Sequence, residues 1–321
     1  MTVCILGAGA FGTALAIALS ETNNIHLWGR NAEGMAEVRA TRKSSMLPGA
    51  ILGTNIKVTS DAKAAIQGVD FILSVVPLQY TGATLKSLVG YFEGQPLIGC
   101  SKGVDLTTGK GGYSILKASY PNGPTGLLTG PSFATDIARG LPTALTLASE
   151  SVQAVSNWQA NLSNDTLRLY VSHDPIGAEL GGALKNVIAI ACGATIGAGL
   201  GESARAALVT RGQAEIVRYA MHFGAYPETL AGLSGFGDLC LTCTSEKSRN
   251  YRYGHALGQN KGFDPTVTVE GKATAIALVP IMQRLNIDMP ITKAVAGLCS
   301  GTVTVTQALT TLMARPLRKE T

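Results

Sequence analysis

Apolar residues follow two alternating patterns through the first half of the chain. Short continuous apolar runs, typical of strands buried on both faces of a parallel sheet, alternate with segments of helical spacing. The expected strands cover residues 3–6, 25–28, 71–76, 96–100, 127–129, 143–147 and 167–171. The expected helices between them include residues 13–19, 31–40 and 79–89. This alternation predicts a doubly wound, Rossmann-type α/β sheet, with ligands at the carboxyl ends of its strands.

The pattern changes after about residue 173. Strand-like runs fade, and long helical windows cover residues 176–195, 203–223, 269–285 and 291–300. We therefore expect a dinucleotide-binding domain over residues 1–172 and an all-α domain for substrate binding and catalysis over residues 173–321. Residues 315–321 form a polar tail.

Composition and charge narrow the class of protein. Hydrophobic residues make up 46% of the 321 and charged residues 15%, which suits a large buried core. The net charge of +5 comes without a block of Lys and Arg interleaved with aromatics, so we expect no nucleic-acid partner. The first 20 residues lack the basic segment of a signal peptide, and the uncharged run 186–201 is shorter than the ~20 residues of a membrane span. We expect a cytoplasmic protein without stable membrane insertion, whose helical half could bury an apolar face in a homodimer.

Six cysteines bear on metal and redox chemistry. Cys240 and Cys243 have the spacing of a redox or metal pair, but no second Cys/His pair accompanies them. We interpret them as small residues in a packed turn and expect no metal site. Reduced thiols fit a cytoplasmic protein.

The first expected strand leads into a glycine-rich turn. Gly7, Gly9 and Gly12 follow it directly and precede a helix-forming segment. In a strand–turn–helix unit, such glycines permit a tight turn, the approach of a pyrophosphate to bare backbone, and close packing of helix on strand. A glycine pattern alone is weak in a chain with 38 glycines, but this context predicts a dinucleotide site.

The end of the second expected strand bears on which dinucleotide binds. NAD-binding proteins carry an Asp or Glu there, which accepts hydrogen bonds from the ribose hydroxyls. Here the strand is followed by Arg30, and the first acid is Glu33. Arg30 would attract the 2′-phosphate of NADP, and a solvated surface arginine is the alternative. The sequence favours NADP(H) and leaves NAD(H) open.

A lysine stands inside the apolar part of the second half. Lys185 and Asn186 lie in the otherwise uncharged segment 181–197, where an ammonium is costly unless it has a partner or a task. Near a carboxylate, a buried lysine can act as an acid or a base. Asp238, in the glycine-dense turn 233–239, could supply that carboxylate. The alternative is a lysine that reaches solvent from near the helix start.

Three further polar segments are candidate sites. Lys102 and the segment 130–132 each follow an expected strand, so they could face a cofactor or a substrate oxygen. A solvated lysine and an ordinary turn are the alternatives. Ser248, Arg249 and Asn250 offer a hydroxyl, a forked cation and an amide, which together suit a phosphate. A helix N-cap at Ser248 beside an exposed arginine is the alternative.

These segments together resemble bacterial soluble NAD(P)-dependent glycerol-3-phosphate dehydrogenase. The resemblance runs in order from Val3 to about Leu312. It rests on the motifs at residues 7–12, 27–30, 101–103, 130–134, 183–187, 235–239, 242, 248–250 and 269–271. It implies reversible hydride transfer between NAD(P)H and C2 of dihydroxyacetone phosphate, which gives sn-glycerol 3-phosphate for glycerophospholipid synthesis.

The resemblance also implies roles for individual residues. Lys185 matches the catalytic lysine that passes a proton to or from the C2 oxygen, and Lys102 matches a lysine shared between cofactor and substrate. The expected catalytic set is Lys185, Lys102, Asp238, Asn186 and Thr242. The expected cofactor contacts are Gly7, Gly9, Ala10, Phe11, Gly12, Arg30, Lys102, Ala134, Arg249, Thr268 and Glu270. The expected substrate contacts are Lys102, Gly130, Ser132, Lys185, Asp238, Ser248, Arg249 and Asn250.

Two other functions fit the same pattern less well. A β-hydroxyacid or ketopantoate reductase would share the two-domain plan, but its substrates carry carboxylates rather than phosphates. A nucleotide-binding protein without chemistry would keep the Rossmann fold alone. The presence of Lys102, Lys185 and Asp238 disfavours the second alternative.

Overall fold

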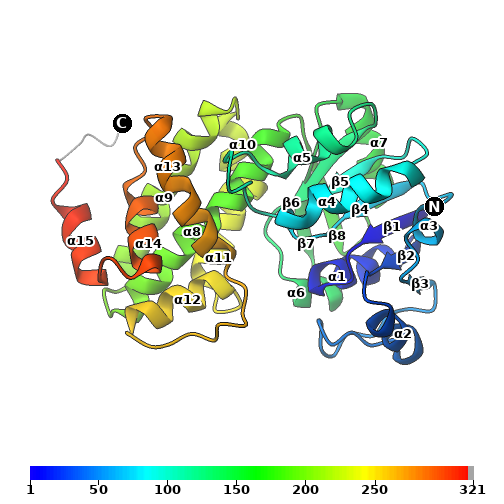
Figure 1. Ribbon diagram of the computed structural model, residues 1–321, viewed down its shortest axis with the longest axis horizontal. Coiled ribbons are helices and arrows are strands. Elements are labelled where there is room, and N and C mark those ends of the chain that lie inside the picture. The colour runs from blue at the N-terminus through cyan, green and yellow to red at the C-terminus, as the bar shows by residue number, and fades with distance from the viewer. Residues whose placement is uncertain (317–321) are drawn as a thin grey trace.

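The first half of the chain forms one eight-stranded sheet covered by helices, in a computed structural model that describes residues 1–316 (Figure 1). The strand order is β3-β2-β1-β4-β5-β6-β7-β8. The strands are β1 (Thr2–Leu6), β2 (Asn24–Trp28), β3 (Ile56–Thr59), β4 (Phe71–Ser74), β5 (Leu97–Gly99), β6 (Thr125–Thr129), β7 (Thr143–Ala148) and β8 (Leu167–Ser172). The order reverses beside β1, so the doubly wound sheet is confirmed.

Two features of the sheet differ from the apolar pattern. The pattern did not indicate β3, because this short strand alternates polar and apolar residues. Strands β1 to β6 are parallel, but β7 pairs antiparallel with β6, and β8 follows the direction of β7. The sheet is therefore mixed. The apolar runs could not predict this, because they report burial on both faces of a strand and not its direction.

Helices cover both faces of the sheet. Val3 and Ile5 of β1 share a core cluster with residues of α1 and α7, whereas Cys4 and Leu6 share one with residues of α3, α4 and α5. This alternation is the two-residue period of a strand, and it explains why β1 is apolar throughout. The helices of this half are α1 (Ala10–Leu19), α2 (Ala32–Thr41), α3 (Ala62–Ile66), α4 (Leu78–Leu88), α5 (Gly112–Ser119), α6 (Ala134–Ala138) and α7 (Val152–Leu162), with a 3-10 turn at Val89–Tyr91.

The second half is helical and is built around α8 (Pro175–Gly197) (Figure 1). Asp174 caps the start of α8 through the Gly177 N–H, and Pro175 occupies its first turn. This helix is long and apolar enough to cross a membrane, but 89% of its apolar window is buried inside the protein. The prediction of a buried core helix is confirmed.

The remaining helices pack around α8 or extend from it. They are α9 (Glu202–His222), α10 (Pro227–Ala231), α11 (Asp238–Thr244), α12 (Arg249–Gly258), α13 (Glu270–Arg284), α14 (Pro290–Ser300) and α15 (Val305–Met313), with a π-helical turn η2 at Leu233–Gly237. The four expected helical windows correspond to α8, α9, α13 and α14. The expected polar tail over residues 315–321 lies outside the described residues from 317 onward.

Candidate active site

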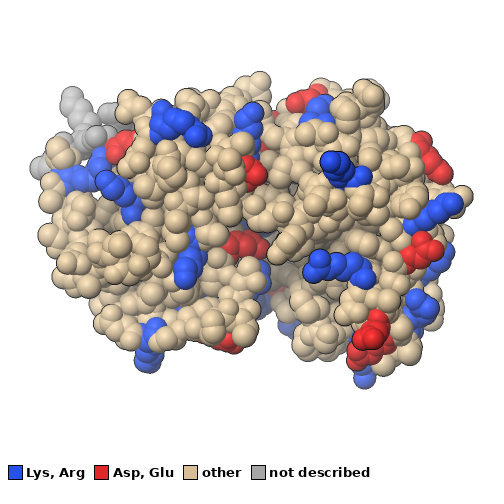
Figure 2. Space-filling view, viewed as in Figure 1, with Lys and Arg blue, Asp and Glu red and all other residues tan. Residues whose placement is uncertain are grey.

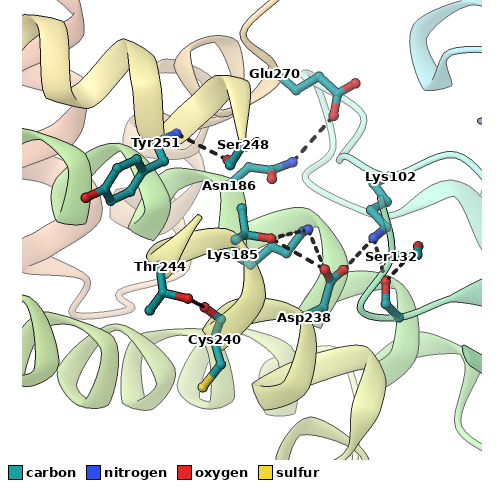
Figure 3. Close-up of polar contacts among 12 residues, drawn as sticks. Lys102, Ser132, Lys185, Asn186, Asp238, Cys240, Thr244, Ser248, Tyr251 and Glu270 are labelled. Carbon is teal, nitrogen blue, oxygen red and sulfur yellow. Dashed lines mark hydrogen bonds and ion pairs between the residues drawn. The ribbon is translucent and has the colours of Figure 1, made fainter. Parts of the chain in front are cut away.

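A buried carboxylate lies where the two halves meet. Asp238 is the first residue of α11, directly after η2, and its side chain is 0% exposed. Lys185 Nζ donates to its Oδ1 at 2.6 Å, and Lys102 Nζ donates to its Oδ2 at 2.5 Å (Figure 3). Lys185 comes from α8 of the helical half and Lys102 from the loop after β5 of the sheet half. One carboxylate therefore holds an ammonium from each half.

Lys185 has the buried partner that its sequence context predicted. The residue is 6% exposed, and its Nζ also contacts Thr242 Oγ1 at 2.6 Å. Burial lowers the pKa of Lys185 to about 8; Asp238 opposes this shift, and the positive charge of Lys102 adds to it. A lysine whose pKa is this close to neutral can give or take a proton. The solvent-reaching alternative is wrong.

Lys102 reaches the carboxylate beside α8 and Gly130. Its Nζ also donates to the carbonyl oxygen of Gly130 at 3.0 Å, and Ser132 Oγ donates to that same oxygen at 3.3 Å. On α8, a Cβ at Gly182 would lie 3.7 Å from Lys102 Cδ and 3.0 Å from Thr129 Oγ1. The loops after β5 and β6 therefore meet α8 at this point, and their polar groups share one site.

The glycine turn after β1 has the geometry that a dinucleotide needs. Gly7 has φ +126°, and a Cβ at Gly12 would overlap the Gly7 carbonyl oxygen. A Cβ at Gly9 would meet no atom within 4 Å, so open space lies over the backbone at the start of α1. Gly9 caps α1 without a side-chain hydrogen bond. The turn is thus tight where glycine packs and open where a pyrophosphate would approach.

The other expected cofactor residues surround this turn or lie in the helical half. Ala134 begins α6 and packs beside Ala10 and Phe11 of α1. Arg30 is exposed two residues after the end of β2, and Thr268 is exposed two residues before α13. The sequence alone did not reveal the packing of α6 on α1, because the two helices are more than a hundred residues apart in the chain.

The segment 248–250 begins α12. Ser248 is the N-cap, and its buried hydroxyl accepts from the Tyr251 N–H at 3.2 Å, so the capping interpretation is confirmed for this residue. The Arg249 side chain is 51% exposed, and its guanidinium lies 3.7 Å from Glu270 Oε1. Asn250 is buried, and its Oδ1 accepts from the Gly271 N–H at 2.9 Å.

Glu270 links this segment to α8. It begins α13, and its Oε2 accepts from Asn186 Nδ2 at 3.4 Å (Figure 3). Asn186 is the residue after Lys185, so the segment with Arg249 lies beside the lysine pair. Figure 2 shows a groove between the two halves on one face of the molecule.

The cysteines and metal-ligating residues form no second site within residues 1–316. No group of three or more His, Cys, Asp or Glu side chains that could hold a metal ion is present in that range. Cys240 is half-buried and Cys243 is buried, both on α11 with free thiols. Burial raises the pKa of both thiols, as expected for packed side chains.

Two residues near the site were missed from the sequence. Gly182 lies close to Thr129 at the end of β6, and Glu179 lies buried on α8, six residues before Lys185. A carboxylate in an apolar helix is a signal of the same kind as the lysine itself. That signal was available for Glu179, whereas the role of Gly182 depends on a partner from a distant strand.

Comparison with known proteins is consistent along the whole chain. Residues 2–155 match the family model of the NAD-dependent glycerol-3-phosphate dehydrogenase N-terminus, and residues 174–310 match that of its C-terminus. Among relatives, the glycerol-3-phosphate dehydrogenase (NAD(P)+) of Roseobacter denitrificans is 54% identical over 321 residues and 100% of both chains. That of Cereibacter sphaeroides is 52% identical over 98% of this chain and 99% of its own.

Solved structures show the same relationship. The crystal structure of glycerol-3-phosphate dehydrogenase from Coxiella burnetii has a TM-score of 0.90 and 34% identity, over 98% of this chain and 99% of that one. A ketopantoate reductase from Ralstonia eutropha has a TM-score of 0.60 and 16% identity, over 96% of this chain and 100% of that one, so it shares the fold alone. The chain belongs to the NAD-dependent glycerol-3-phosphate dehydrogenase family.

Proposed function

We propose that this protein transfers a hydride reversibly between NAD(P)H and C2 of dihydroxyacetone phosphate, giving sn-glycerol 3-phosphate. The observation that carries the proposal is the pair of lysines, one from each half, on the single buried carboxylate of Asp238. Membership of the family supports the same reaction. We further propose that the product serves glycerophospholipid synthesis in the cytoplasm.

The lysine pair accounts for the proton chemistry. When bound, a nicotinamide supplies or accepts the hydride. Reduction of a ketone develops negative charge on its oxygen, and the Lys185 ammonium would donate a proton to that oxygen. Asp238 Oδ1 and Thr242 Oγ1 both accept hydrogen bonds from Lys185 Nζ, each at 2.6 Å. Lys102 would add a second positive charge near the developing negative charge.

Arg249 and Asn250 account for recognition of the substrate phosphate. The exposed guanidinium can donate two parallel hydrogen bonds, and its long 3.7 Å pairing with Glu270 leaves most of its donors free to do so. Asn250 uses its Oδ1 on the Gly271 N–H, which leaves its amide N–H groups for an anion. Ser248 holds the first turn of α12 in place. When Arg249 and Asn250 hold the phosphate, the C2 carbon of the substrate is held at a fixed distance from them, which orients it for hydride transfer.

The chemistry and the cofactor divide between two parts of the chain. We place the boundary between residues 172 and 173, because β8 ends at Ser172 and α8 begins at Pro175. Gly7, Gly9 and Gly12, with Ala10, Phe11 and Ala134, would hold the dinucleotide on the sheet half. Gly130 and Ser132 would face the substrate from the same half.

The test of this function is steady-state kinetics with phosphorylated and carboxylate ketones. We expect turnover of dihydroxyacetone phosphate and none of ketopantoate or of β-ketoacids. Arg249→Ala should raise the KM for dihydroxyacetone phosphate by about two orders of magnitude, because the anion loses its forked donor. Arg252→Ala, an exposed arginine on the same helix, is the matched control. An unchanged KM in Arg249→Ala would remove the phosphate role.

Arg30 provides a separate test of cofactor choice. We propose that it binds the 2′-phosphate and that the enzyme prefers NADP(H). Arg30→Ala should then raise the KM for NADPH by at least about tenfold and leave that for NADH nearly unchanged. Equal changes for both cofactors would contradict the assignment.

A further inference from the structure

A loop of the sheet half is inserted into the helical half. Residues 103–111, which we call the strap, directly follow Lys102. Val104 is fully buried within the core cluster of the helical half. At the other end of the strap, the carbonyl oxygen of Gly109 accepts from Tyr219 Oη of α9 at 3.0 Å, in a buried position. The strap thus crosses from one half into the core of the other.

The base of the strap is held by a carboxylate of α8. Val104 and Gly111 form an antiparallel bridge that closes the strap. Glu179 Oε2 accepts from the Tyr113 N–H at 2.5 Å, and the Gly111 N–H also donates to this carboxylate. Both N–H groups belong to the start of α5, which has no side-chain cap of its own. Glu179 therefore caps a helix of the sheet half from the helical half.

Two glycines of the strap are shaped to these two contacts. A Cβ at Gly111 would overlap the Glu179 carboxylate, and a Cβ at Gly109 would overlap the Tyr219 hydroxyl. Gly109 also has φ +76°, which favours glycine. Burial of Glu179 is costly, and the proposed chemistry does not use this carboxylate. The hydrogen bonds from the Gly111 and Tyr113 N–H groups offset part of this cost.

The strap connects these contacts to Lys102. Lys102 lies two residues before Val104, and its stem passes Gly182 of α8. Glu179 and Lys185 are six residues apart on α8, or about 9 Å along its axis. The helix that carries Lys185 therefore also holds the loop from which Lys102 projects.

We propose that Glu179 and Tyr219 are positioning residues, which hold the strap so that Lys102 stays on the Asp238 carboxylate opposite Lys185. The inference rests on the proposed role of Lys102 in the reaction. It predicts that these two residues act on turnover through Lys102 and not independently of it.

The test is a double-mutant cycle on kcat/KM for dihydroxyacetone phosphate. Tyr219→Phe removes one hydroxyl and keeps the ring, so we expect a folded enzyme with kcat/KM reduced about tenfold. In a Lys102→Ala enzyme, the same change should lower kcat/KM by less than about twofold, because the residue to be positioned is gone. Tyr253→Phe, which removes a hydroxyl from α12 of the same half, is the matched control.

A second cycle keeps the result independent of one variant. Glu179→Gln preserves the shape of the side chain. Alone, it should reduce kcat/KM about tenfold, and in the Lys102→Ala enzyme it should reduce kcat/KM by less than about twofold. Two outcomes would overturn the inference and leave the proposed role of Lys102 intact. One is a loss of kcat/KM that multiplies with that of Lys102→Ala in both cycles, and the other is wild-type kcat/KM in Tyr219→Phe and Glu179→Gln. A wild-type kcat/KM in Lys102→Ala itself would overturn it together with the proposed role of Lys102.

Discussion

At the scale of single residues, opposing effects on the pKa of Lys185 meet at one carboxylate. Asp238 faces two ammonium groups, and its negative charge stabilises the protonated form of Lys185. Burial and the neighbouring Lys102 act in the opposite direction and leave the pKa of Lys185 at about 8. In the proposed reaction, this balance would let Lys185 serve as the acid in ketone reduction and as the base in alcohol oxidation.

This balance predicts the pH dependence of both directions. Lys185 is protonated below its pKa, so kcat/KM for reduction should fall as the pH rises through about 8, and kcat/KM for oxidation should rise there. Asp238→Asn removes the charge that raises this pKa, so the transition of the residual activity should move to lower pH. Asp165→Asn, an exposed carboxylate of the sheet half, should leave it in place. An unmoved transition in Asp238→Asn would contradict the coupling.

Part of this site could be predicted residue by residue. Lys185 was identified because a charge in an apolar helix requires a partner, and Asp238 because it lies in a glycine-dense turn. Thr242 came only from the resemblance, since a threonine on a helix carries no local signal. Glu179 was missed, although it lies in the same apolar helix, because the otherwise uncharged segment 181–197 begins two residues after it.

At the scale of elements, the crossing of α8 and α12 sets the spacing of the site. A Cβ at Gly193 of α8 would overlap the carbonyl oxygen of Tyr251, and a Cβ at Gly254 of α12 would overlap that of Ile190. Glycines on both helices thus allow an unusually close approach of the two backbones. Lys185 lies on one helix and Arg249 on the other, so the crossing fixes the distance between the proposed proton donor and the proposed phosphate-binding arginine.

Separation of these helices should affect stability and turnover together. Gly193→Ala should lower the free energy of unfolding by about 1–3 kcal/mol, because a methyl group is forced into a filled contact. It should also lower kcat/KM for dihydroxyacetone phosphate, because the clamp moves relative to Lys185. Urea unfolding and steady-state kinetics measure the two effects. Gly262→Ala, where a Cβ would meet no atom within 4 Å, is the control. If the two variants had the same unfolding free energy and the same kcat/KM, the close approach of α8 and α12 would not set the geometry of the site.

At the scale of the whole molecule, buried apolar side chains and polar contacts both join the two halves, since Val104 of the strap lies in the helical core and Ala178 of α8 lies in a core cluster of the sheet. One core cluster lies around α8, and two others lie on the two faces of the sheet. Buried carboxylates also link separate helices, because a carboxylate of one helix caps the start of another. Glu179 of α8 caps α5 in this way. Glu215 of α9 does the same for α14, where it accepts from the N–H groups of Ile291 at 2.6 Å and Thr292 at 3.1 Å.

Glu215 predicts how the stability of the molecule depends on pH. Burial raises its pKa to about 7 in the folded protein, above the ordinary value of 4.5. The folded state therefore keeps this proton between pH 4.5 and 7 while the unfolded state loses it. The resulting stability, at most about 3 kcal/mol, is complete below pH 4.5 and is lost as the pH rises through about 7.

A comparison of unfolding temperatures checks this dependence. Glu215→Gln should unfold at a lower temperature than the wild type at pH 5, with a smaller fall between pH 5 and pH 7.5, because the titrating group is gone. Glu246→Gln, an exposed carboxylate, should follow the wild type at both pH values. A Glu215→Gln enzyme with the same fall as the wild type would refute the assignment.

The sequence by itself determined the two-part plan, the glycine turn for the dinucleotide, the lysine in an apolar helix and the family. These features depend on near neighbours in the chain or on the order of motifs along it. Only the tertiary structure decided that Lys102 and Asp238, 136 residues apart, share a hydrogen bond. It likewise decided the reversed direction of β7 and β8 and the insertion of the strap into the helical core. Hydrophobic periodicity reports which face of an element is buried, but the partner on that face is chosen by packing of the whole chain.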